Sequence, residues 1–226
     1  MLLYLAINFF TILFPLLFSF ESRIQYYRHW RFVIPSILIT ASWFLIWDYF
    51  FTKNNIWSFN DDFITGIHIS NLPIEEILFF FCIPFACFFI YVIVRELIFL
   101  PATLMKFRWE ILVSALFFLF IGLKNITLTY TAVACTSLGL WLLLLFILRI
   151  NFFTTFLIAF LLQLIPFIIV NGMLTAFPVV EYNDQFNLGI RFFTIPIEDF
   201  VYSGLLMIMN VTFYEWFKAK KVTGNF

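Results

Sequence analysis

The stretch of sequence that decides the fold is LPIEEILFFFCIPFACFFIYVIV, residues 72–94, in which a proline and two acids precede a long apolar run. A helix needs roughly 20 apolar residues to cross the hydrocarbon core of a bilayer. The stretch IPIEDFVYSGLLMIMNVTFYEWF, residues 195–217, begins with the same pattern. Both stretches are therefore predicted to be membrane helices whose first turn carries two carboxyl groups.

Five further apolar runs accompany these two. The chain of 226 residues is 64% hydrophobic and 12% charged, which is far from the composition of a water-soluble protein. The seven predicted membrane helices cover residues 2–20, 32–51, 72–94, 109–123, 128–148, 152–170 and 195–217. We expect an all-α, multi-pass integral membrane protein of about seven transmembrane helices, surrounded by the lipid bilayer and without room for a soluble domain.

The basic residues predict the orientation of these helices. Short cytoplasmic loops carry an excess of Lys and Arg, and placing the N-terminus outside puts ten of the 13 basic residues on the inner side. These ten are Arg23, Arg28, Arg31, Arg95, Lys106, Arg108, Arg149, Lys218, Lys220 and Lys221, against Lys53, Lys124 and Arg191 outside. We expect a cytoplasmic C-terminus in the cell membrane. The formal net charge is zero, so no nucleic acid partner is expected.

The loops that precede the two acid motifs are related to each other. A shift of 123 residues, without a gap, aligns FNDDF (59–63) with YNDQF (182–186) and PIEE (73–76) with PIED (196–199). This repeat predicts a single membrane domain of plan 3+1+3 with parallel repeats: a first three-helix repeat in residues 1–98, a connecting helix in 99–126 and a second repeat in 127–226. Both acid motifs then lie at one depth, in one shared site or in two equivalent sites.

Carboxyl groups are the main candidates for chemistry. Ionisable groups at membrane depth are functional candidates, although a proline followed by acids also makes a well-formed helix start. The candidates are Glu75, Glu76, Glu198 and Asp199, joined by Asp48 near the outer end of the second helix. Asp48 aligns with neutral Asn171 in the repeat and equally suits an interfacial position. Crowded acids repel one another, so at least one is expected to keep its proton.

Four other residues are candidates for substrate binding. Trp47 and Tyr202 lie near the acids and present aromatic faces that steady a cation, although interfacial anchoring explains them equally well. Asn171 is the repeat partner of Asp48, and Arg191 either pairs with the acids or is solvated in the outer loop. The sequence has neither GxGxxG nor GxxxxGK[ST], and its three cysteines lie in apolar runs without a nearby His pair. We therefore expect no bound cofactor or metal.

The paired acid blocks, together with WD at 47–48 and IPFIIVNG at 165–172, resemble the membrane-embedded lycopene cyclases, which occur as two small subunits or in fused form. This sequence is similar to the fused form. The resemblance implies a carotenoid cyclase, an intramolecular lyase or isomerase that closes β-ionone rings at the ends of lycopene without net redox. Relatives form ε- or γ-rings or act on elongated carotenoids, so another linear carotenoid is an alternative substrate.

Two other functional classes compete with a cyclase: a small-solute transporter with a parallel three-helix repeat, and a non-catalytic assembly subunit. For a cyclase, we expect Glu75 or Glu198, the identical acids of the two motifs, to protonate the terminal double bond. Glu76, Asp199 or Asp48 is then expected to balance the cation and to accept the departing proton. Expression in cells that accumulate lycopene separates the three classes, because only a cyclase converts the pigment.

Overall fold

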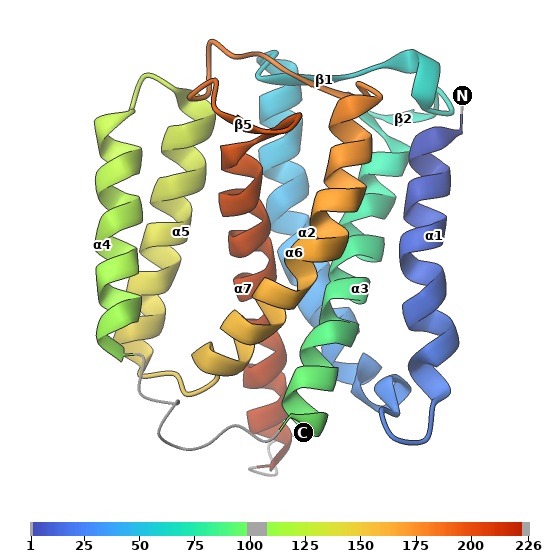
Figure 1. The fold of residues 1–226 in the computed structure, drawn as a ribbon, viewed down its shortest axis with the longest axis vertical. Coiled ribbons are helices and arrows are strands. Elements are labelled where there is room, and N and C mark those ends of the chain that lie inside the picture. Colours follow the sequence, from blue (N-terminus) through green and yellow to red (C-terminus); the bar gives the residue numbers. More distant parts are fainter. Residues whose placement is uncertain (1, 99–107, 223–226) are drawn as a thin grey trace.

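The computed structural model describes residues 2–98 and 108–222, and within them seven α-helices stand side by side in one bundle (Figure 1). They are α1 Leu3–Leu17, α2 Trp30–Lys53, α3 Ile74–Leu97, α4 Arg108–Lys124, α5 Thr129–Leu148, α6 Phe153–Ala176 and α7 Ile197–Val222. The predicted seven helices are confirmed in the described residues, and the fold is mostly helical. Lys106 and the predicted boundary at residue 99 lie outside the described residues.

Five of the described helical spans are long and apolar enough to cross a membrane. They are Leu3–Phe20, Tyr26–Lys53, Ile74–Leu97, Thr129–Leu148 and Phe153–Ala176. The helix α4 has 17 residues, and α7 begins with Glu198 and Asp199 and ends with lysines, so these two are not among the five. The apolar helices agree with the expected membrane protein.

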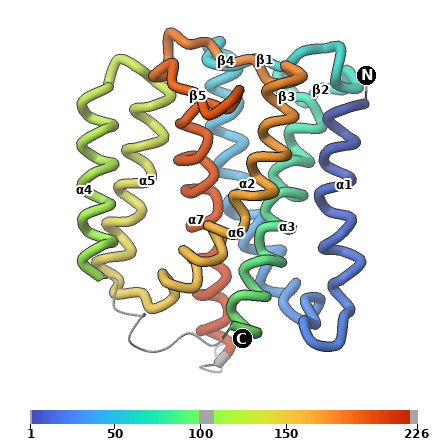
Figure 2. The backbone as a smooth tube through the Cα atoms, viewed as in Figure 1, coloured from blue at the N-terminus to red at the C-terminus, as the bar shows by residue number. Residues whose placement is uncertain are grey.

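Short strands gather at the end of the bundle where the N-terminus lies, and the C-terminus lies at the other end (Figure 1). They were not expected from the sequence, because most have only two residues. They are β1 Trp57–Phe59, β2 His68–Ile69, β3 Leu72–Pro73, β4 Val180–Tyr182, β5 Arg191–Phe192 and β6 Ile195–Pro196. A β2–β3 hairpin leads directly into α3, and a β5–β6 hairpin leads into α7 (Figure 2). The motif prolines thus end a strand and begin a helix, where a missing N–H costs little.

Helices and strands in the second half of the chain lie 123 residues after their counterparts in the first half. This holds for β1 and β4, for β2 and β5, for β3 and β6, for α2 and α6, and for the starts of α3 and α7. Gly66 and Gly189 are separated by the same distance, and both adopt positive φ, at 80° and 69°. Glycine takes this backbone conformation without strain, so the same turn precedes each acid motif.

An antiparallel pair of strands joins the two halves. In it, β1 pairs with β4 so that Trp57 faces Tyr182 and Phe59 faces Val180. Two further backbone hydrogen bonds extend the pair, from Asn60 N–H to the Val179 carbonyl and from Asn183 N–H to the Ile56 carbonyl, each 3.0 Å long. Below this pair, α2 packs against α3 and α7, and α3 contacts both α6 and α7. The acid-bearing ends of α3 and α7 are thereby held next to each other.

Candidate active site

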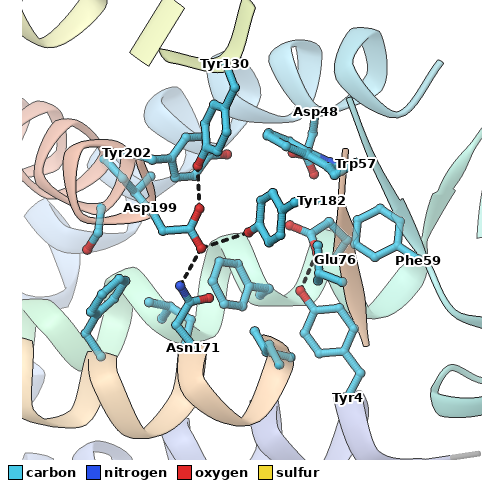
Figure 3. Close-up of a pocket in the computed structure, with 17 residues that line it drawn as sticks. Tyr4, Asp48, Trp57, Phe59, Glu76, Tyr130, Asn171, Tyr182, Asp199 and Tyr202 are labelled. Carbon is cyan, nitrogen blue, oxygen red and sulfur yellow. Dashed lines mark hydrogen bonds between the residues drawn. The ribbon is translucent and has the colours of Figure 1, made fainter. Parts of the chain in front are cut away.

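The second acids of the two motifs meet in one cavity (Figure 3). Glu76 begins α3, Asp199 begins α7, and Asp48 comes from the last turns of α2. All three are at least 93% buried and line a cavity of about 70 Å³. The cavity is lined by Tyr4, Asp48, Trp57, Phe59, Glu76, Phe79, Ile83, Tyr130, Phe167, Asn171, Leu174, Val180, Tyr182, Asp199, Tyr202, Ser203 and Leu206. Acids from both halves therefore share a single pocket rather than two separate ones.

Glu76 is paired with another carboxyl group. The hydroxyl of Tyr4 donates a hydrogen bond to Oε2 of Glu76, and the carboxyl group of Asp48 lies within hydrogen-bonding contact of Glu76. An ionised carboxylate can only accept hydrogen bonds, so two carboxyl groups bond to each other only when one of them carries a proton. Asp48 and Glu76 thus bring two buried carboxyl groups to one side of the cavity.

Asp199 is surrounded by hydrogen-bond donors rather than by another carboxyl group. Its carboxyl group accepts hydrogen bonds from Tyr130 Oη at 2.7 Å, from Tyr182 Oη at 2.9 Å and from Asn171 Nδ2 at 2.6 Å. Burial, together with the neighbouring Asp199 carboxyl group, raises the pKa of Tyr182 in β4 well above its usual range, so its hydroxyl stays a donor. Three donors on one carboxyl group stabilise its ionised form. The acids of the cavity thus differ in their hydrogen-bond partners: Glu76 accepts from one tyrosine, whereas Asp199 accepts from two tyrosines and an asparagine.

Several pairs of repeat positions differ between the two halves, and one of them concerns the partner of each acid. Asn171 contacts Asp199 in the second half, where Asp48 contacts Glu76 in the first half. An asparagine amide donates to a carboxylate but does not titrate, so it cannot hold a transferable proton. Figure 3 shows the side chain of Tyr182 between Asp199 on one side and Glu76 on the other.

The first acids of the two motifs lie outside the cavity lining and hold the loops. Oε1 of Glu75 accepts the N–H of Thr65 at 2.7 Å. Oε1 of Glu198 accepts the N–H of Leu188 at 2.9 Å and the hydroxyl of Thr131 at 2.6 Å. Thr65 and Leu188 are repeat partners, so both acids tie the preceding loop to the helix start. Proton delivery by Glu75 or Glu198 therefore stays a prediction.

Aromatic rings form one wall of the cavity. Tyr130 and Tyr182 are stacked with ring centroids 6.0 Å apart, and Trp57 lies edge-on to both at 5.2 and 6.0 Å. The ring of Tyr202 is 6.2 Å from that of Trp57, so the predicted Tyr202 joins the same wall. Aromatic faces attract cations, most strongly where water is excluded.

Two other predicted binding residues lie away from this wall. Trp47 packs behind it, 5.1 Å from Tyr202, and is not part of the cavity lining. Arg191 is exposed in β5, where it donates to the Asp184 carboxylate at 2.6 Å and to the Thr194 carbonyl at 3.0 Å. A hydrogen bond from Asn187, together with Arg191, holds the pKa of Asp184 below its usual range. Arg191 therefore pairs with a loop acid and not with the buried acids.

Tyr4, Tyr130 and Tyr182 donate to the cavity acids but were not among the site residues predicted from the sequence. Tyr4 and Tyr130 are the two that come from distant helices. They bind acids that lie 72 and 69 residues further along the chain. The repeat does not point to them either, because its shift places Tyr4 on Thr127 and Ile7 on Tyr130. In the described part of the chain, no three His, Cys, Asp or Glu side chains are placed to hold a metal ion together.

A comparison with known proteins shows the family to which the chain belongs. A family model described as lycopene cyclase matches residues 1–94 and 127–217, which is most of the chain. The chain belongs to the lycopene cyclase family. The ranges shared with this family contain every acid of the cavity and leave out α4.

A curated relative is the bifunctional lycopene cyclase/phytoene synthase of Phaeosphaeria nodorum, which is 31% identical over 71 residues. That alignment covers 31% of this chain and 12% of the relative, so the chain spans only a small part of its length. No solved structure matches this member of the lycopene cyclase family.

Proposed function

We propose that this protein is a carotenoid cyclase that closes β-ionone rings at the ends of lycopene, as an intramolecular lyase or isomerase without net redox. The observation that carries the proposal is the cavity in which the Asp48 and Glu76 pair faces Asp199 across aromatic rings. Ring closure at an alkene end needs one acid, one base and protection of a cation from water. The cavity offers each of these.

In the first step, the proton shared by Asp48 and Glu76 moves to the inner CH carbon of the terminal double bond, so that the charge develops on the outer, dimethyl carbon. The alkene electron pair forms the new C–H bond and leaves a tertiary carbocation. A double bond further along the chain then attacks this cation, which closes the ring and moves the positive charge into it. General acids placed in this way contribute about 10²- to 10⁴-fold to a rate. The remaining carboxylate of the pair balances the charge.

In the last step, Asp199 removes a proton from a ring carbon beside the cation, and the C–H electron pair becomes the ring double bond. The carbon that loses its proton decides between a β-, ε- and γ-ring, so the position of Asp199 sets the product. One proton has been added and one removed, so the substrate is neither oxidised nor reduced. The proton on Asp199 must return to the acid pair, and Tyr182 lies between the two sites.

We also propose that all seven helices cross the cell membrane as a 3+1+3 bundle with parallel repeats. The common distance of 123 residues between the elements of the two halves supports the repeat. The ten-to-three division of basic residues supports an outer N-terminus and a cytoplasmic C-terminus. Both hairpins and the acid cavity then lie toward the outer face, within reach of substrate dissolved in the bilayer.

This orientation predicts the outcome of cysteine labelling. In a variant with Cys82, Cys87 and Cys135 replaced by Ala, a cysteine introduced at Asp61 should react with a membrane-impermeant maleimide in intact cells. A cysteine at Arg28 should react only after the cells are opened, because it faces the cytoplasm. The reverse pattern, with position 28 labelled and position 61 protected, would show that the bundle is inverted.

Pigment conversion tests the activity itself. In cells that accumulate lycopene, expression of this chain should replace lycopene with a product that carries β-rings at both ends, identified by absorption and chromatography. Purified protein in lipid nanodiscs should do the same without added cofactor. If lycopene stays unchanged while the protein is folded and inserted in the membrane, the cyclase function is rejected. The transporter and the assembly subunit then remain as candidate functions.

A further inference from the structure

A series of connected pockets leads away from the acid cavity. The cavity shares Phe79, Ile83, Phe167, Asn171 and Ser203 with a second pocket of about 60 Å³, which we call the neck. These residues come from α3, α6 and α7. The neck therefore adjoins the space that the acids line.

The neck in turn opens into a groove between α1, α3 and α6. Thr11, Ala86, Ile90, Pro166 and Val170 line both the neck and this groove, whose volume is about 670 Å³. Apolar side chains make up almost all of its wall. Its outer edge carries the exposed side chains Phe10, Phe14, Ile169 and Met173. In the proposed membrane arrangement, this edge faces lipid.

The paths of α1 and α6 explain why the groove is open. Figure 1 shows α6 running obliquely across the bundle while α1 stands upright, so the two helices diverge along their length. Pro166 lies inside α6 and Pro15 inside α1, and both line the groove. A proline inside a helix removes a backbone hydrogen bond and bends the helix away from a straight path.

A buried amide in the neck has no partner. Gln163 is 1% exposed and lines the neck, and neither Nε2 nor Oε1 of its side chain makes a hydrogen bond to another residue that the structure describes. A buried polar group without a partner is costly, and in native proteins such groups usually contact water or a ligand. The amide N–H groups can donate weakly to the π-face of a conjugated chain. The neck thus has the character of a ligand passage.

We propose that the groove and the neck bind the polyene chain of a linear carotenoid while its end group reaches the acids. This inference rests on the proposed cyclase function. A cavity of about 70 Å³ accepts only the end of such a substrate, so the rest of the chain needs an apolar site that is continuous with the acids. The groove is continuous with them, opens toward lipid, and has the volume of a typical ligand site.

A binding measurement separates this site from the chemistry. In a Glu76→Gln background, where substrate is held but not converted, lycopene should co-purify with the protein in nanodiscs. Adding Ala86→Phe, which places a ring between neck and groove, should lower the bound lycopene about 10-fold or more. Ala176→Phe is the matched control, because Ala176 is exposed on α6 and does not line the groove. It should leave the bound lycopene unchanged.

A reversible block tests the groove in protein that has already folded. In the cysteine-free background, Met173→Cys at the groove edge should react with a bulky methanethiosulfonate, and conversion of lycopene should fall about 10-fold or more. A reducing agent that removes the adduct should restore conversion, which excludes unfolding as the cause. Ala176→Cys carrying the same adduct should remain active.

The two proposals fail in different ways. If the parental protein does not convert lycopene, the proposed function is rejected whatever the groove binds. If the parental protein converts lycopene while both Ala86→Phe and the blocked Met173→Cys keep parental binding and conversion, the groove proposal is overturned. A further outcome is that phospholipid co-purifies with the protein in place of lycopene and disappears in the Ala86→Phe variant. That result would assign the groove to lipid and would also overturn the groove proposal.

Discussion

Replacing Glu76 with Gln should reduce ring closure by about 10³-fold, because the amide cannot share a transferable proton with Asp48. Asp48→Asn should have an effect of the same size, since it converts the acid pair into the kind of amide–carboxylate contact that Asn171 and Asp199 already make. In the proposed mechanism the two residues act as one acid, so the double variant should be no slower than either single variant. Initial rates of lycopene conversion in nanodiscs measure all three.

Glu75→Gln is the matched control for this result. The amide oxygen of Gln still accepts the Thr65 N–H, so the loop stays in place and the rate should remain within about 10-fold of the parental rate. A Glu76→Gln variant that keeps the parental rate would remove Glu76 from the acid site. A loss at Glu75→Gln as large as that at Glu76→Gln would return proton delivery to the first acid of the motif.

Asp199→Asn should also lower the rate by about 10³-fold, for a different reason. The change removes the negative charge that faces the ring cation and the base that takes the departing proton. Asp199→Glu keeps the charge and should recover part of the rate. Because the base decides which ring carbon loses its proton, we also expect the residual product of Asp199→Glu to contain rings with a shifted double bond. Chromatographic analysis of the rings measures both effects.

Glu198→Gln provides the comparison within the same motif. Its amide oxygen keeps the bonds from Leu188 and Thr131, so the rate should stay within about 10-fold of parental and the ring type should not change. Parental activity in Asp199→Asn, with protein that is folded and inserted, would exclude Asp199 as the base. The mechanism would then need another acceptor for the proton.

The sequence was informative where a pattern extended over a whole helix or recurred at a fixed distance. Apolar runs of membrane length predicted the helices, and the repeated PIEE and PIED motifs predicted that acids begin α3 and α7. Asp48 could be chosen because it stands out in an apolar helix. These signals depend on hydrophobicity and local spacing, which a single chain displays directly.

The roles of adjacent acids could not be predicted in the same way. On a helix, neighbouring residues point about 100° apart, so Glu75 and Glu76 face different surroundings, and only the packing of other helices decides which one meets the cavity. Tyr4 and Tyr130 approach their acids from α1 and α5, across long separations in sequence. For Arg191 the sequence left two positions open, and the fold of the loop, which brings Asp184 to it, gives the exposed loop position rather than a contact with the buried acids.

The pairing of β1 with β4 bears on why the two halves of the site carry different residues. Trp57 meets Tyr182 while Phe59 meets Val180, so each strand presents the same positions to the other, as in the isologous contact of a homodimer. Two identical three-helix chains joined by this ribbon would carry identical acids, and any substitution would appear twice. A single chain is free of that constraint: it keeps Asp48 on one side and Asn171 on the other, so in the proposed mechanism one half donates the proton and the other accepts it.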